Sequence, residues 1–64
     1  MTEEEQRRAK ARDFLRLICP EAHMTFYAAE GVWQVFVQNR SLGKSSHDYC
    51  RAIDNAILYL KSAS

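Results

Sequence analysis

The apolar residues of this chain change their spacing twice, and these changes limit the fold more than any other feature. Residues 3–19 carry apolar side chains along one helical face, residues 24–30 and 32–38 alternate as strands do, and the helical spacing returns after residue 46. The pattern predicts an α+β chain in the order helix, strand, strand, helix. The first helical face consists of Ala11, Phe14, Leu15 and Ile18. The second consists of Tyr49, Ala52, Ile53, Ala56, Ile57 and Leu60.

The ends of the first helix have clear signals. Thr2 followed three residues later by Glu5 forms a capping box, in which each residue satisfies a backbone N–H of the first turn. Pro20 disfavours helical geometry in the residue before it, so the helix is expected to end at about residue 19.

Ser45 or Ser46 is expected to cap the second helix, and Ser45 with Asp48 three residues later forms another capping box. Residues 39–46 before it are predicted to be a polar loop. The helix should continue to about residue 61, and residues 62–64 should fray.

The two strands predict a hairpin with a two-residue turn at Glu30 and Gly31, which pairs Ala29 with Val32. A slip of one residue would mix polar and apolar side chains on both faces. Both helices are expected to pack on the apolar face, with Trp33 largely buried between them. That face carries Met24, Phe26, Ala28, Trp33, Val35 and Val37. The opposite face carries Thr25, Tyr27, Ala29, Val32, Gln34, Phe36 and Gln38.

The length of 64 residues predicts one domain, residues 1–64, with a marginal core, because such a chain buries only about 60% of its unfolded surface. Self-association is therefore expected. Tyr27, Val32 and Phe36 on the uncovered sheet face are the predicted contacts with a second copy or a protein partner. Edge-to-edge pairing into a four-stranded sheet is the competing dimer geometry. Leu58, on the back of the second helix, is a secondary contact candidate.

The charge is balanced, with nine Lys and Arg against eight Asp and Glu, which argues against a polybasic nucleic-acid binder. A local basic stripe is nevertheless present, because Arg8, Arg12 and Arg16 recur every four residues on the first helix. The stripe has two interpretations: a solvated helix face, or a row of phosphate contacts. The second interpretation gives the alternative function, a small nucleic-acid-binding regulator.

Two cysteines and two histidines occur at spacings that zinc could use, Cys19-x3-His23 and His47-x2-Cys50. The strand alternation points His23 away from the helices that carry both cysteines, so no metal is expected. Cys50 and His47 lie one helical turn apart but lack an orienting group and an oxyanion site. Neither a cofactor nor an enzymatic activity is therefore predicted.

No apolar run approaches the roughly 20 residues that a membrane span needs. The acidic N-terminal residues lack the apolar core of a signal peptide. The expected location is the cytoplasm, away from membranes.

Residues 33–60 contain a strand with a tryptophan, then a short polar stretch, then a helix with an alanine-rich, cysteine-containing start. The residues that carry this pattern are Trp33, Val35, Cys50, Arg51, Ala52, Ala56 and Leu58. The pattern resembles small phage-encoded helix–strand–strand–helix proteins, over less than half of the chain. The resemblance implies a phage or prophage accessory protein, a class that includes inhibitors of host defence systems. The predicted function is thus a non-enzymatic interaction module that dimerises and binds a host protein such as a defence component.

Overall fold

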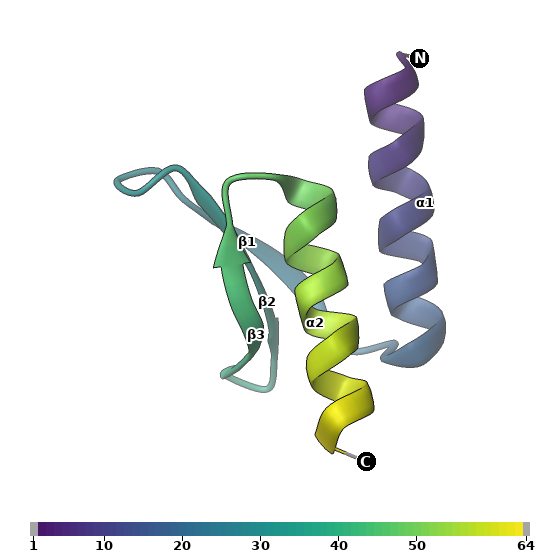
Figure 1. Ribbon diagram of the computed structural model, residues 1–64, viewed down its shortest axis with the longest axis vertical. Helices are drawn as coiled ribbons and strands as arrows, with labels where there is room; N and C mark the ends of the chain where they lie inside the picture. Colours follow the sequence, from purple (N-terminus) through teal and green to yellow (C-terminus); the bar gives the residue numbers. More distant parts are fainter. Residues whose placement is uncertain (1, 64) are drawn as a thin grey trace.

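The computed structural model describes residues 2–63 and has two helices and three strands (Figure 1). The order is α1 (Glu3–Ile18), β1 (His23–Tyr27), β2 (Val32–Val37), β3 (Arg40–Ser46) and α2 (Tyr49–Ala63). The α+β class and both helices are confirmed. The strand β3 replaces the predicted polar loop, so the sheet has three antiparallel strands in the order β1-β2-β3.

Helix α1 begins at the predicted N-cap, Thr2, and ends one residue before the predicted end. The Thr2 side chain accepts a hydrogen bond from the Glu5 backbone N–H at 3.2 Å. The last residue is Ile18, and the Cys19 N–H donates to the Leu15 carbonyl at 2.8 Å, directly before Pro20.

The hairpin of β1 and β2 has the predicted faces but a different register. Tyr27 pairs with Val32, and Phe26 pairs with Trp33, so the pairing is shifted by two residues from the prediction. The turn spans residues 28–31, because the N–H groups of Glu30 and Gly31 both donate to the Tyr27 carbonyl. Since side chains alternate with a period of two, a two-residue shift leaves the side chains within β1 and β2 on their expected faces, whereas Ala28, Ala29 and Gln38 lie in turns.

Strand β3 follows a tight turn at Gln38 and Asn39, whose φ angles are +49° and +66°. Two consecutive positive φ angles are typical of the type I′ hairpin turn. The ladder with β2 then contains a bulge, because Trp33 pairs with Ser46 but Val35 pairs with Leu42. The bulge and the single large apolar residue of this strand, Leu42, explain why no alternating pattern is visible in the sequence.

Helix α2 begins at Tyr49, after a cap formed by Asp48 rather than by either predicted residue, Ser45 or Ser46. The Asp48 carboxylate accepts from the Cys50 N–H at 3.4 Å, and the Ser46 hydroxyl accepts from the Asp48 N–H at 3.2 Å. The helix continues through Ser62 and Ala63, two residues beyond its predicted end at about residue 61. Ser64 lies outside the described residues.

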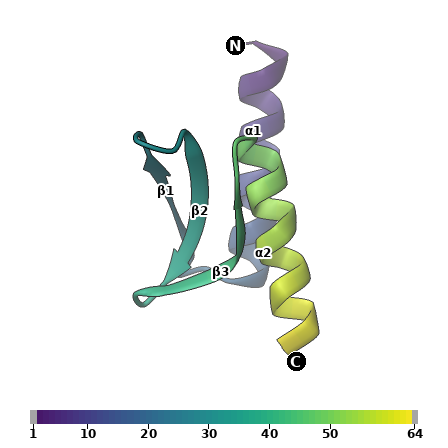
Figure 2. The same ribbon diagram turned by 60° about the vertical axis from the view of Figure 1, so that its left-hand side comes forward.

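Both helices lie on one side of the sheet (Figure 2), but only α2 packs directly on the strands. Helix α1 packs on α2, and its backbone approaches no strand closely. Of the predicted face of α1, only Leu15 is fully buried, whereas Phe14 is 52% exposed and Ile18 is 41% exposed. The helix therefore contributes one anchor to the core and stands away from β1.

The buried core lies between α2 and the strands. Its members are Leu15, Ala22, Val35, Leu42, Tyr49, Ile53, Ala56 and Ile57. Within residues 2–63, neither helix is long and apolar enough to cross a membrane.

Candidate functional site

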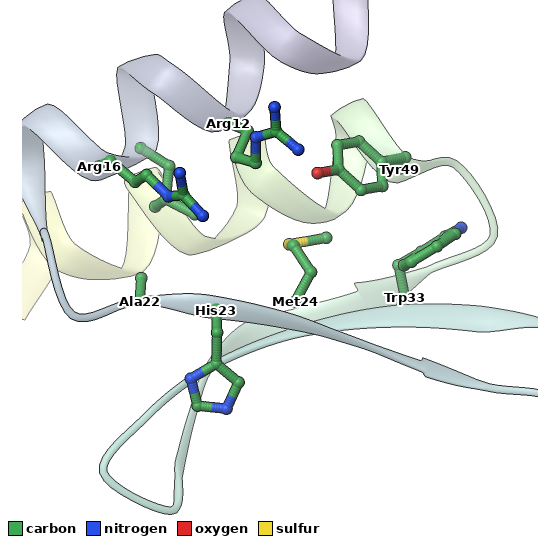
Figure 3. A pocket seen from close by; sticks show the side chains of 8 residues that line it. Arg12, Arg16, Ala22, His23, Met24, Trp33 and Tyr49 are labelled. Carbon is green, nitrogen blue, oxygen red and sulfur yellow. The ribbon is translucent and has the colours of Figure 1, made fainter. Parts of the chain in front are cut away.

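A groove of about 320 Å³ lies between α1 and the start of β1 (Figure 3). We call it the α1–β1 groove. It exists because α1 rests on α2 and leaves the adjacent part of the sheet uncovered. The residues that line it are Arg12, Leu15, Arg16, Ala22, His23, Met24, Trp33 and Tyr49.

Two of the three arginines predicted as phosphate contacts reach this groove. Arg12 and Arg16 are both exposed, and their side chains project from α1 into the groove, that of Arg12 toward Tyr49 (Figure 3). Neither makes an ion pair or a hydrogen bond within residues 2–63. Their donors are therefore open to a ligand.

Arg8, the third member of the stripe, is engaged elsewhere. Its guanidinium carbon lies 5.8 Å from the centroid of the Trp33 ring and 5.2 Å from that of Tyr49. The same guanidinium pairs with the Glu4 carboxylate at 3.3 Å. Arg8 thus holds the aromatic wall of the groove rather than facing a ligand with free donors.

That aromatic wall consists of Trp33 and Tyr49, whose rings meet edge to face with centroids 5.0 Å apart. The Phe26 ring packs against the Trp33 indole, with the two ring centroids 4.8 Å apart. Trp33 lies in the central strand β2 and is partly buried against the core. It contacts Tyr49 of α2 and Arg8 of α1, so it lies between the two helices as predicted, although the groove leaves part of its ring accessible.

Tyr49 supplies a polar group inside the groove. The residue is 8% exposed, and its hydroxyl points into the hollow between the Arg12 and Met24 side chains (Figure 3). Among the described residues this hydroxyl has no hydrogen-bond partner, and no polar side-chain atom of theirs is both fully enclosed and unsatisfied. The hydroxyl is therefore accessible from the groove.

A second hollow of about 370 Å³ adjoins the first and shares Arg12 and Tyr49 with it. Its other lining residues are Glu5, Arg8 and Ala9. The charge therefore changes sign along α1, because acidic residues fill its first turn whereas Arg12 and Arg16 lie farther along. An anionic ligand is favoured at the Arg12–Arg16 end and disfavoured near Glu5.

The uncovered sheet face, turned away from both helices, carries a row of three rings. Phe36 lies between His23, at a centroid distance of 6.1 Å, and Tyr27, at 6.2 Å. Tyr27 is 41% exposed and Phe36 is half-buried. We call these three residues the outer aromatic row. Sequence reasoning identified Tyr27 and Phe36 but not the contribution of His23.

Two other predicted contact residues do not join this row. Val32 is only 8% exposed, so it offers almost no contact area, and its assignment as a contact is corrected here. Leu58 is 62% exposed but lies on α2, outside the sheet. Gln34 of the same face is also buried, because its amide reaches into the bulge and lies 3.1 Å from the Gly43 carbonyl oxygen.

The cysteines and histidines do not form a metal centre in residues 2–63, where no three His, Cys, Asp or Glu side chains gather. Cys19 and Cys50 are free, half-buried thiols. The His23 ring points away from the α1–β1 groove (Figure 3). His47 Nδ1–H donates to the Gly31 carbonyl at 3.0 Å, which ties the β1–β2 turn to the start of α2.

The sequence pattern identified the arginine stripe, but it assigned Trp33, Met24 and Tyr49 to the core and did not predict that they line a groove. The one available signal was Tyr49 itself, since a buried tyrosine usually needs a partner for its hydroxyl.

Comparison of the chain with protein-family models, curated proteins and solved structures gives no match.

Proposed function

We propose that the protein is a non-enzymatic binding module that holds a nucleic-acid strand in the α1–β1 groove. The observation that carries this proposal is the pair of unpaired guanidinium groups, Arg12 and Arg16, beside a groove with an aromatic wall. A groove of this size lies at the small end of the range for ligand sites, roughly 300 Å³ and above.

The chemistry of the two arginines favours phosphate. A guanidinium group presents its donors in a planar fork that matches two oxygens of a phosphate, and it stays charged at all relevant pH values. Residues four apart on a helix are separated by about 6 Å along the axis. Arg12 and Arg16 therefore suit one phosphate or two neighbouring phosphates of a strand.

The groove side chains favour binding over catalysis. Apart from the arginines, they present a thioether, an indole and a phenol, and the one histidine that borders the groove turns its ring away (Figure 3). These groups form contacts to bases and phosphates, but they do not make a paired nucleophile and base.

The test is binding of a fluorescent single-stranded oligonucleotide across a salt series. Log affinity should fall with log salt, with a slope of about −0.7 for each phosphate contact in a single strand. Replacing both groove arginines, R12Q/R16Q, should weaken binding and reduce that slope by about 1.4. Glutamine preserves helix propensity, so α1 should stay folded.

The matched control is R7Q/K10Q, which removes the same charge from exposed positions of α1 that line neither hollow. This variant should keep the wild-type slope. Equal losses in the two double variants would reject the groove, because only the net charge would then matter. Tight binding of polyglutamate with the same arginine dependence would point to an acidic protein instead of a nucleic acid.

A second candidate function rests on the outer aromatic row. Neither helix covers this sheet face (Figure 2). Three aromatic rings lie on it, those of His23, Phe36 and Tyr27. Aromatic residues are enriched where proteins contact one another. The face therefore suits a protein partner, first of all a second copy of this chain, and the resemblance to phage accessory proteins adds a host protein as the alternative occupant.

Sedimentation velocity tests this second candidate. Wild-type protein at high concentration should sediment as a dimer, and Phe36→Glu should sediment as a folded monomer. A wild-type monomer would reject self-association through this face. A host-protein partner whose binding is indifferent to both Tyr27→Glu and Phe36→Glu would reject the face as a contact surface.

A further inference from the structure

We infer that the α1–β1 groove receives one unpaired nucleobase of a single-stranded nucleic acid, with the adjoining phosphate at Arg12 and Arg16. This inference rests on the proposed function and specifies its ligand. It follows from the shape of the site, from the Tyr49 hydroxyl and from the apolar surface below it.

The site is concave, and this decides between a single strand and a duplex. When proteins read a duplex, a protruding helix or ribbon enters the groove of the nucleic acid. Here the ligand must instead enter a hollow of about 320 Å³ in the protein. A base within a duplex is stacked and paired and cannot enter, whereas an unpaired base is free to turn into such a hollow.

The interior of the groove offers an apolar surface for the flat face of a base. Met24 rises from β1 into the hollow, and Trp33 stands at its end (Figure 3). A methionine thioether is polarizable and makes favourable contacts with aromatic rings. The Trp33 ring packs against the rings of Phe26 and Tyr49, at centroid distances of 4.8 Å and 5.0 Å, and these contacts hold it in place as one wall of the groove.

The Tyr49 hydroxyl supplies the polar contact that an apolar pocket lacks. It belongs to a residue with only 8% exposure, it points into the hollow, and no described residue satisfies it. Because a hydroxyl both donates and accepts, it fits the mixed donors and acceptors on the edge of a base. Arg8, over the Tyr49 ring at 5.2 Å, fixes the ring so that the hydroxyl keeps this direction.

The experiment compares three DNA ligands of about eight nucleotides, a length within the range of single-strand binding sites. They are an intact single strand, a strand with the same phosphates but without bases, and a duplex. The intact strand should bind at least about fivefold more tightly than the strand without bases, because contact with one base has that effect or a larger one. It should also bind more tightly than the duplex.

The Tyr49→Phe variant separates base contacts from phosphate contacts, because it removes one hydroxyl and keeps the ring. It should weaken binding of the intact strand, leave binding of the strand without bases unchanged, and preserve the salt slope. Tyr59→Phe, at a 40% exposed position of α2 outside the groove, should change nothing. The melting temperature of Tyr49→Phe should be at least that of wild type, which shows that folding is intact.

Failure of this inference can be distinguished from failure of the proposed function. Equal binding of strands with and without bases, or tighter binding of duplex with the same Arg12 and Arg16 dependence, would overturn the unpaired-base inference and leave phosphate binding standing. The absence of binding to all three ligands would overturn both.

Discussion

The guanidinium carbon of Arg8 lies 5.2 Å from the centroid of the Tyr49 ring. Arg8 also stands over Trp33 at 5.8 Å and pairs with Glu4, so it joins α1 to the aromatic wall of the groove. The three regularly spaced arginines therefore have two different roles. Arg8 orders the site, whereas Arg12 and Arg16 keep their donors for a ligand.

The Arg8 contacts should be measurable as stability. A cation over an aromatic face contributes about 0.5–1 kcal/mol at an exposed site. Arg8→Gln should lower the free energy of unfolding by about 1 kcal/mol, measured by urea denaturation. Arg7→Gln, an exposed neighbour outside both hollows, should leave stability unchanged within about 0.5 kcal/mol. Equal effects would mean that Arg8 does not hold the rings.

The single core anchor of α1 gives a second prediction, with a matched control on the same helix. Leu15 is 1% exposed and Leu17 is 82% exposed. Leu15→Ala should cost about 2–5 kcal/mol, enough to unfold much of so small a domain, because it leaves a cavity where α1 meets the core. Leu17→Ala should be nearly neutral in a thermal melt followed by circular dichroism. Similar melting temperatures for the two variants would contradict the described seating of α1.

Gly43 and Gly31 provide a third prediction, because both have left-handed φ angles, +74° and +69°. A Cβ at Gly43 would lie 2.5 Å from the Asn55 carbonyl oxygen of α2, whereas one at Gly31 would meet only His47 Nδ1, at 3.8 Å. Gly31→Ala should cost about 1 kcal/mol, from backbone strain alone. Gly43→Ala should cost clearly more, because β3 must also move away from α2. Equal losses of unfolding free energy would show that β3 and α2 are not in close contact here.

The strand faces were predictable, and the register was not. Alternation of Met24 and Phe26 with Thr25 and Tyr27 decides which side chains face the helices, whatever the length of the turn. The glycine at position 31 suggested a two-residue turn, but it occupies the last position of a longer one. The longer turn shifts the pairing of β1 and β2 by two residues relative to the predicted two-residue turn. Because a shift of two keeps each strand residue on the same face, the apolar pattern cannot distinguish the two registers.

The third strand escaped prediction for a different reason. Residues 40–46 contain one large apolar side chain, Leu42, and a bulge breaks their alternation. The strand is held by backbone pairing with β2, by packing against α2, and by the Gln34 amide, which lies 3.1 Å from the Gly43 carbonyl oxygen. None of these contacts leaves a periodic signal.

The groove depends on tertiary packing that the residue pattern does not contain. Helical spacing placed Arg12 and Arg16 beside Leu15, as observed, but it also placed Phe14 and Ile18 in the core. In the structure Phe14 is 52% exposed, because the backbone of α1 lies close to α2 and to no strand. Because α1 stands away from β1, a groove opens between them, and Arg12 and Arg16 form one of its walls.

The most direct measurement of the central claim uses Trp33, the single tryptophan of the chain, which borders the groove. Titration with an unlabelled single-stranded oligonucleotide at about 50 mM salt should change Trp33 fluorescence to saturation, and the half-saturating concentration should rise at about 200 mM salt. The R12Q/R16Q variant should show no saturable change over the same range. A strand that binds wild-type protein while Trp33 emission stays constant, or an unchanged titration of R12Q/R16Q, would contradict the assignment of the α1–β1 groove as the binding site.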